Sequence, residues 1–334
     1  MSLGEKDGKR VWRGRQPGFS LLEMLITLVI LLGVTGIVMT AMMGMTKNQG
    51  TVANRTEMHS SVRSATEVLQ QEIGQAGKVS LAGSTPVTIP LTPVTLTTAV
   101  SVLNSPVLVT VSSAAGMFNG EQLAIDTGDN EETVTVSNLS LATNTFNATF
   151  YLPTLTVPLH AIGAPVRVEG AFASGIIPTS VANGSGDFLL KLYGDVNDDG
   201  DMEYIEYWCD TAGGNLYRNV VAIAPGATKL AFNPSMIILS NLLDNPPDPG
   251  ATTPAPCFKY QQKQVGADTY VVDVSVTLTV QTANKDPQTN QFQTETKALL
   301  NVSPRNVFEG WQLASGGVAN RIEPMPATVL SLLP

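Results

Sequence analysis

Twelve residues in the second half of the chain place carboxylates and an amide at alternate positions. The run from Asp195 to Glu206 reads DVNDDGDMEYIE and fits the D-x-[DN]-x-[DN]-G-x5-E pattern of a calcium-binding loop. Oxygens spaced in this way can converge on a hard cation, and Gly200 permits the sharp turn between them. The pattern therefore predicts a Ca²⁺ site. The alternative is an acidic hairpin turn, because Asn, Asp and Gly also favour turns.

The residues after the turn decide which side chains can be ligands. The run EYIEYW from Glu203 is rich in β-forming residues and predicts a strand, not the helix of the usual calcium loop. A strand rising about 3.3 Å per residue carries Glu206 roughly 20 Å beyond Gly200, so Glu206 is not expected to be a ligand. The expected ligands are Asp195, Asn197, Asp199, Asp201 through its carbonyl, and Glu203.

The chain has two cysteines, Cys209 and Cys257. In an oxidising compartment they are expected to form a disulfide, and two separate free thiols are the alternative. The segment between them is rich in proline over residues 245–256 and is expected to be a surface loop.

Other candidate groups do not indicate catalysis. His59 and His160 have no metal-ligand spacing and no nucleophile motif beside them, and the chain has no glycine-rich phosphate loop and no C-x-x-C. We therefore expect a protein that is not an enzyme.

A further group of acids lies among turn residues and is interpreted as a solvated loop in preference to a binding site. Its members are Glu121, Asp126, Asp129, Glu131 and Glu132.

The overall composition excludes several classes of protein. The 334 residues are 43% hydrophobic and 14% charged, which is unlike a charge-driven disordered chain. Nineteen basic and 28 acidic residues give a net charge of -9, so direct contact with nucleic acid is not expected. The basic residues are unevenly distributed, because five of them lie within residues 1–18.

That basic segment precedes 27 residues, 19–45, that contain one charged side chain, Glu23. As a helix this run is about 40 Å long, enough to cross a bilayer core of about 30 Å. The positive-inside rule then places the N-terminus in the cytoplasm and the body of the protein outside it. A secretory signal peptide would have a shorter apolar region and an A-x-A site. A plain anchor would leave Glu23 unexplained, because a carboxylate in lipid is costly.

Residues 18–23, GFSLLE, resemble the processing signal of type IV prepilins and type II secretion pseudopilins. The resemblance implies that a prepilin peptidase cuts between Gly18 and Phe19 and that Phe19 becomes N-methylated. It also implies that Glu23, the fifth residue of the mature chain, neutralises the free amine of a neighbouring subunit in a filament. The pairing is physically reasonable, since an amine and a carboxylate are each expensive alone in an apolar core.

Beyond Lys47 the pattern becomes that of an amphipathic helix. Apolar residues recur at helical spacing, Arg63 and Glu67 stand four apart, and Gly77 is typical of a helix end. The recurring residues are Met58, Val62, Ala65, Leu69, Ile73 and Ala76. Pilins have one continuous helix, and residues 19–76 match it; a stalk or coiled-coil neck is the alternative. Residues 63–77, and more weakly Tyr217-Arg218 and Pro304-Arg305-Asn306, resemble PilW-type minor pilins or J-type pseudopilins.

The rest of the chain is rich in strand-forming residues. Residues 269–282 alternate between valine or leucine and polar side chains, which predicts a half-buried strand. Shorter alternations interrupted by turn residues predict a compact β insertion. They lie at 107–113, 132–141, 149–155 and 164–170.

The predicted fold class is α+β: a long N-terminal α-helix, transmembrane and then amphipathic, packed on an antiparallel β-sheet head with an all-β insertion. The predicted segments are a leader (1–18), a transmembrane or filament-core helix (19–46), an amphipathic helix (47–78), a β-rich insertion (79–180), a pilin-like head (181–309) and an extended tail (310–334).

The predicted function is that of a structural minor pilin in, or at the tip of, a type IV pilus. Its expected partners are the prepilin peptidase, other pilins or pseudopilins, and the inner-membrane assembly platform. The expected precursor crosses the inner membrane once, and the mature chain ends in a pilus or pseudopilus. The alternatives are a pseudopilin of a type II secretion or DNA-uptake system, or a membrane-anchored extracytoplasmic binding module.

Overall fold

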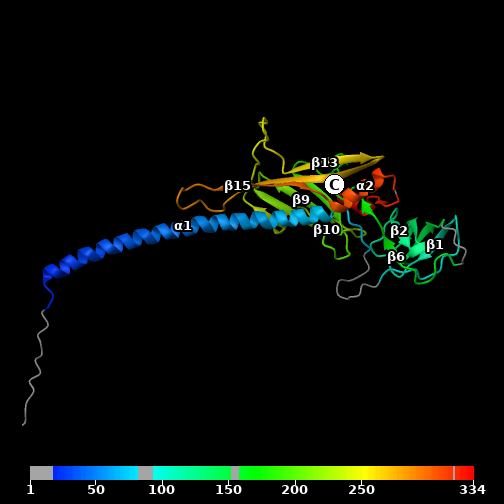
Figure 1. Cartoon of the computed structure of the whole chain (residues 1–334), viewed down its shortest axis with the longest axis horizontal. Helices are drawn as coiled ribbons and strands as arrows, with labels where there is room; N and C mark the ends of the chain where they lie inside the picture. Colours follow the sequence, from blue (N-terminus) through cyan, green and yellow to red (C-terminus); the bar gives the residue numbers. More distant parts are fainter. Residues whose placement is uncertain (1–17, 82–92, 152–157, 319) are drawn as a thin grey trace, which may run out of the picture. The chain divides into compact units, whose positions relative to one another are not determined.

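The computed structural model of the chain describes residues 18–81, 93–151, 158–318 and 320–334 (Figure 1). Its first element is α1 (Leu21–Gln75), a single helix of 55 residues, which confirms the continuous helix predicted from the sequence. The chain leaves α1 through Gly77, whose φ is +82° and whose missing Cβ would lie 2.7 Å from Val307 Cγ2. Glycine suits this position because it adopts positive φ without strain and leaves room for that neighbour.

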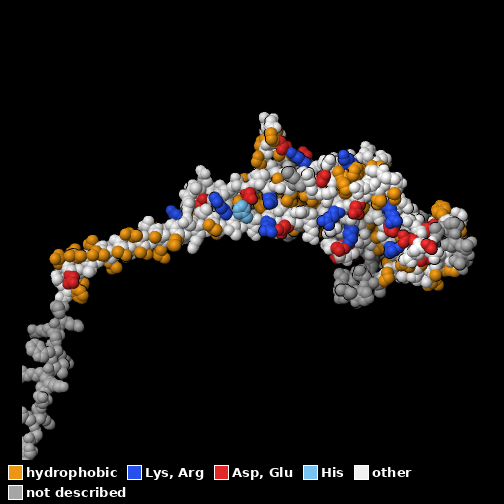
Figure 2. All heavy atoms as spheres, viewed as in Figure 1, with side chains coloured by type: hydrophobic (Ala, Val, Ile, Leu, Met, Phe, Trp, Pro, Cys, Tyr) orange, Lys and Arg blue, Asp and Glu red, His pale blue; other side chains and the backbone are white. Residues whose placement is uncertain are grey.

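Within the described residues, α1 is the one helix long and apolar enough to cross a membrane. Hydrophobic side chains gather along its N-terminal part (Figure 2), and those between Leu21 and Met45 are exposed. A soluble protein does not leave so long an apolar surface in water. The protein therefore has a possible N-terminal membrane anchor.

The described chain falls into two compact units, which are considered separately. One contains the chain up to Ala53 together with the loop Asp286–Gln291. In this unit Thr51 Oγ1 donates a hydrogen bond to Asp286 Oδ1 at 2.7 Å. The other unit contains Asn54–Lys285 and Phe292–Pro334.

The second unit begins with the amphipathic part of α1. All six apolar residues predicted to share a helical face, from Met58 to Ala76, are buried there. They belong to one hydrophobic cluster with strand residues such as Ile205, Val274 and Leu278. The predicted pair of Arg63 and Glu67 is also present, with Nε and Oε1 2.7 Å apart.

Two antiparallel sheets supply the strand residues of that cluster. One sheet has the order β11-β10-β9-β8, formed by β8 (Leu189–Gly194), β9 (Glu203–Asp210), β10 (Asn215–Ala222) and β11 (Ile237–Ser240). The other has β14 (Asp268–Gln281) at its centre, paired with β12 (Leu242–Leu243), β13 (Phe258–Val265) and β15 (Thr294–Val302). In β14 the predicted alternation is confirmed from Val272 to Leu278, where every second residue is buried and those between are partly exposed. It fails at Val271 and Thr279, which are also buried.

A separate hydrophobic cluster, which we call the β module, draws its buried residues from Val94 to Val166. Its strands are β1 (Pro106–Thr110), β2 (Gln122–Ile125), β3 (Glu132–Thr135), β4 (Ser137–Ser140), β5 (Thr145–Thr149) and β6 (Val166–Val168), and a short 3-10 helix η1 covers Gly128–Asn130. They form two antiparallel sheets, β1-β5-β4 and β3-β2-β6. The predicted run 132–141 forms two strands, β3 and β4. The predicted run 149–155 is wrong at residues 150 and 151, which are not in a strand, and residues 152–157 lie outside the described residues.

The prediction of an extended tail over 310–334 is wrong. Helix α2 (Arg305–Ser315) enters this range, followed by β16 (Ile322–Glu323), which pairs in parallel with β7 (Ala171–Phe172), and by α3 (Ala327–Leu332). Val329, Leu332 and Leu333 are buried in a cluster with Phe172 and Tyr193. Pro326, which lies within the predicted tail, is the N-cap of α3, where a missing N–H is no loss. A second 3-10 helix, η2 (Pro234–Met236), precedes β11.

Candidate functional site

The residues of the predicted processing signal lie immediately before α1. Gly18, Phe19 and Ser20 are outside the helix and exposed, and Phe19 is 77% exposed. Ser20 caps the N-terminus of the helix, since its Oγ accepts a hydrogen bond from the amide of Leu22 and its carbonyl accepts one from the amide of Met24. The peptide bond between Gly18 and Phe19 is therefore outside the hydrogen-bonded backbone of α1 and open to an enzyme.

Glu23 lies in the first turn of α1 and is exposed among apolar neighbours such as Leu22 and Met24. A carboxylate in this turn interacts favourably with the positive end of the helix dipole, by about 0.3–1 kcal/mol at an exposed position. That gain is small beside the cost of a charge in lipid.

One end of the acidic loop is held by a lysine. Asp195 is 1% exposed, and its carboxylate accepts hydrogen bonds from Lys78 Nζ at 2.9 Å, Ser80 Oγ at 2.6 Å and the Asp199 amide at 3.1 Å. Lys78 also pairs with Asp198. These bonds and the lysine charge hold the pKa of Asp195 below its usual value, against the effect of burial. Lys78 and Ser80 were missed from the sequence, because no local spacing links them to a loop more than 100 residues away.

Among the residues that the structure describes, no lysine or arginine pairs with the other end of the loop. Asn197 Nδ2 donates to Asp199 Oδ2 at 2.8 Å and to Glu203 Oε1 at 3.0 Å, and the Asp201 amide donates to Asp199 Oδ1 at 2.9 Å. Glu203 Oε2 is buried and accepts no hydrogen bond from the described residues. Burial, and then the neighbouring carboxylates of Asp199 and Asp195, raise the pKa of Glu203 to about 7.

Glu206 is separate from the loop. It lies within β9, as the strand prediction requires, and it is buried. Its Oε1 accepts a hydrogen bond from Lys229 Nζ at 2.7 Å and lies 3.2 Å from Lys191 Nζ. These two lysines neutralise Glu206, so it has no part in the predicted calcium site.

The loop fits a calcium ion only in part. Across the described ranges, no three or more His, Cys, Asp or Glu side chains are grouped so as to hold a metal ion. Asn197 presents its NH₂ group to the carboxylates of Asp199 and Glu203. A cation there would need the amide rotated so that its oxygen faces inward, and the unpartnered oxygen of Glu203 is available to it.

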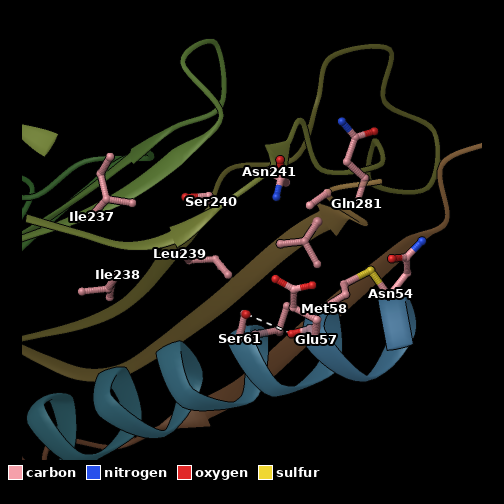
Figure 3. Close-up of a pocket in the computed structure, with 13 residues that line it drawn as sticks. Asn54, Glu57, Met58, Ser61, Ile237, Ile238, Leu239, Ser240, Asn241 and Gln281 are labelled. Carbon is pink, nitrogen blue, oxygen red and sulfur yellow. Dashed lines mark hydrogen bonds between the residues drawn. The ribbon is translucent and has the colours of Figure 1, made fainter. Parts of the chain in front are cut away.

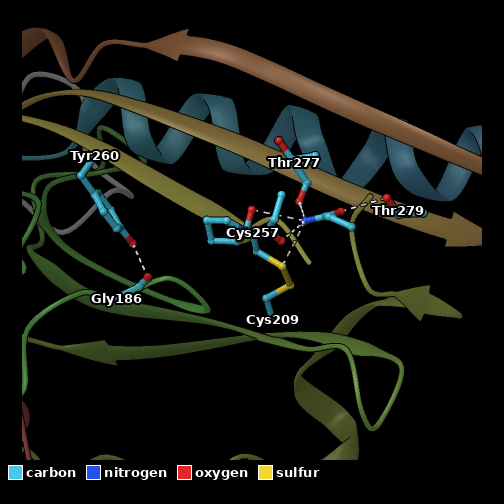
Figure 4. The surroundings of a disulfide bond; sticks show 9 residues. Gly186, Cys209, Cys257, Tyr260, Thr277 and Thr279 are labelled. Atoms are coloured by element: carbon cyan, nitrogen blue, oxygen red, sulfur yellow. Dashed lines mark hydrogen bonds between the residues drawn. A yellow bond between two sulfur atoms is a disulfide. The ribbon is translucent and has the colours of Figure 1, made fainter. Parts of the chain in front are cut away.

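The predicted disulfide between Cys209 and Cys257 is confirmed (Figure 4). It joins the end of β9 to the residue before β13, and both cysteines are buried. The segment between Asn245 and Ala255 is exposed over residues 246–254, which confirms the predicted surface loop. Asn245 closes the base of that loop by donating from Nδ2 to the carbonyl of Thr277 at 2.9 Å.

The amphipathic part of α1 is tied to the head by polar contacts as well as by its apolar face. Glu72 is buried and accepts hydrogen bonds from Tyr207 Oη and from Arg218 Nε, the latter at 3.0 Å. Asn306 Nδ2 donates to the carbonyl of Gln75 at 3.0 Å and so satisfies the last turn of the helix. Arg218 and Asn306 are two of the residues that carried the weaker part of the resemblance.

The two histidines contact other side chains of the fold, and two of the acids of residues 121–132 lie buried in it. His160 is 1% exposed, with Nδ1 3.3 Å from Asp126 Oδ2 and its ring 5.1 Å from that of Phe150. His59 pairs with Glu295 at 2.5 Å on the surface. Of the acids interpreted as a solvated loop, Glu121 and Glu132 are buried, so that interpretation is wrong for both.

A cavity of about 280 Å³ lies between α1 and the turn that joins β11 to β12 (Figure 3). Asn54, Glu57, Met58 and Ser61 line it from α1, and Ile237–Asn241 line it from the sheet side. Glu57 is the one titratable side chain among its lining residues. A single carboxylate without a base or nucleophile beside it does not make a catalytic site.

Comparisons of the chain with protein-family models, with curated proteins and with solved structures found no match.

Proposed function

We propose that this chain is a minor prepilin or pseudopilin, a structural subunit that is cut after Gly18 and assembled through its N-terminal helix. One observation carries the proposal: Gly18-Phe19 and Glu23 stand at the start of a continuous helix whose first part is apolar and exposed. Cleavage there would leave an amine four residues before a carboxylate. Both charges become tolerable in an apolar bundle when they are paired between subunits.

The second part of α1 supports the same assignment. A filament subunit must transmit load between its core helix and its exposed head, so the two should be firmly joined. The apolar cluster from Met58 to Ala76 and the buried contacts of Glu72 with Tyr207 and Arg218 make such a joint. In the proposed arrangement this helix packs on the antiparallel head, and the β module is an insertion carried by that head.

The proposed partners follow from the processing signal and the helix. They are a prepilin peptidase, the inner-membrane assembly platform, and other pilins or pseudopilins whose helices bundle with α1. The proposed precursor crosses the inner membrane once and keeps its body outside the cytoplasm. The role is structural and not enzymatic, and the acidic head is a poor surface for direct contact with nucleic acid.

Assembly should depend on Glu23 more than processing does. In cells that carry the assembly machinery, we expect Glu23→Gln to be cut normally but to enter filaments at least about tenfold less, because an unpaired amine would remain in the apolar core. Cross-linking of the mature chain to neighbouring subunits measures this. Glu57→Gln is the matched control, an exposed acid on the same helix beyond the apolar part. Equal incorporation of the Glu23→Gln variant and the wild type would argue against the proposed ion pair.

We further propose that Ca²⁺ binds the open end of the acidic loop through Asn197, Asp199, Glu203 and the carbonyl of Asp201, beside the expected ligand Asp195. The unpartnered oxygen of Glu203 supports this assignment. Saturating calcium is expected to raise the melting midpoint of the full chain relative to chelator, since binding at 100 times Kd adds about 2.7 kcal/mol. Asp199→Asn should abolish the increase and Asp248→Asn, an exposed acid of another loop, should not. Identical midpoints with calcium and with chelator would contradict the calcium site. The loop would then be an acidic turn whose charge is neutralised by Lys78.

A further inference from the structure

Two acidic side chains from distant parts of the sequence are buried where the β module meets the C-terminal segment. Glu121 immediately precedes β2 and is 0% exposed, and Glu323 lies in β16 and is 1% exposed. Carboxyl groups are rarely buried so completely unless a cation accompanies them. Across the described ranges, neither Glu121 nor Glu323 has an ion-pair partner within 4 Å.

The hydrogen bonds of the two carboxyl groups are few and come from the backbone. The Gln122 amide donates to both oxygens of Glu323, at 3.1 and 2.9 Å. The Phe118 amide donates to Glu121 Oε2 at 3.3 Å, while Glu121 Oε1 is buried and has no hydrogen-bond partner in the described chain. These amide donors favour the ionised form, but they are too few to offset the cost of burying a charge, so the arrangement as a whole favours the neutral acid.

Two glycines bring the backbone of the segment around β16 close to the residues that flank the β module. Gly170 has a φ of +85°, and a Cβ on it would lie 1.8 Å from the carbonyl oxygen of Arg321. A Cβ on Gly120 would lie 3.0 Å from Pro324 Cγ. Gly120 and Gly170 thus allow the segment around β16 to approach closely, and the Glu121 and Glu323 side chains are buried at this junction.

The charged and titratable groups around the pair do not neutralise it. Arg321, two residues before Glu323, is paired with Glu169, the residue that follows β6. The Tyr193 hydroxyl of β8 is hydrogen-bonded to Ser174 at 2.8 Å, and Tyr270 and Asp268 of β14 line a cavity together with Glu323. Burial raises the pKa of Glu323 to about 8, and burial together with the charge of Glu323 raises the pKa of Glu121 well above its usual value.

We propose that Glu121 and Glu323 form a pH-sensitive latch, which holds the β module on the C-terminal segment while both are protonated and releases it when alkaline pH ionises them. The sign follows from proton linkage. The closed state binds protons more tightly than the open state, so its advantage is complete below the ordinary carboxyl pKa of about 4.5 and is lost as pH rises toward about 8. The latch does not depend on the pilin assignment.

Hydrogen exchange of the full chain in detergent tests the latch directly. After correction for intrinsic exchange, the opening constant of amides in residues 120–124 and 321–323 should rise with pH between 5 and 8, by up to about tenfold per unit for each proton released. Glu323→Gln and Glu121→Gln mimic the neutral acid, and each should reduce that slope. Glu309→Gln, an exposed acid on α2, is the matched control and should keep the wild-type slope.

Three outcomes would overturn the latch. They are a wild-type opening constant that does not change with pH, a slope in both glutamine variants equal to that of the wild type, and failure of both variants to fold at pH 5. The last outcome counts against the proposal because an amide has nearly the shape of a protonated carboxyl group and should be accepted in its place.

Discussion

Gly18→Trp is expected to leave the chain uncut in cells, with residues 1–18 still attached. The proposed peptidase acts at the bond between Gly18 and Phe19, which lies in exposed backbone immediately before α1. A bulky side chain beside the scissile bond should prevent that backbone from entering an active site shaped for glycine. Because the substitution is expected to prevent the peptidase from recognising its site, nearly all of the chain should remain uncut.

The same substitution at a second glycine distinguishes an effect on processing from an effect on membrane insertion. Gly33→Trp is the matched control, since it adds the same side chain to the apolar helix at a position where a Cβ would have open space around it. It should be cut as the wild type is. Mass analysis of the membrane fraction measures whether residues 1–18 have been removed from each variant. Normal cutting of Gly18→Trp, or an equal block in Gly33→Trp, would contradict the assigned site.

Removing the disulfide should have the largest effect on stability. Cys209 and Cys257 are 48 residues apart, and closing a loop of that length stabilises a fold by about 4 kcal/mol in the chain-entropy model. The double replacement Cys209→Ala and Cys257→Ala is therefore expected to lower the free energy of unfolding by about 4 kcal/mol. Urea unfolding of the full chain in detergent measures this change.

The loop itself supplies the control for that experiment. Replacing Pro247 and Pro249, which lie in the exposed part between the cysteines, by alanine changes the loop without opening it. This variant should stay within about 1 kcal/mol of the wild type. Reduced wild-type protein should match the double alanine variant. Equal stability of the oxidised and the alanine proteins would show that the cross-link does not constrain the unfolded chain.

The helix and strand that could be predicted from the sequence have apolar residues that repeat at a regular spacing along the chain. The buried face of α1 from Met58 to Ala76 follows the helical repeat, and the alternation in β14 follows the two-residue repeat of a strand. The disulfide was predictable because the chain offers a single possible pair. None of these predictions needed knowledge of which distant segment lies alongside.

The parts that were missed depend on long-range contacts. Asp195 is neutralised by Lys78, 117 residues earlier, and the Gln122 amide bonds to Glu323, 201 residues later. Neither contact has a local signature. The tail over 310–334 was mispredicted for a different reason, since a proline such as Pro326 is as compatible with the start of a helix as with an extended segment.

Intact-mass measurement of the protein purified from its own membranes shows whether the chain is processed as a pilin subunit. We expect a chain that begins at Phe19, lacks residues 1–18 and carries one additional methyl group on its N-terminus. A full-length chain that still contains Gly18 and the basic segment before it would contradict the assignment as a pilin subunit.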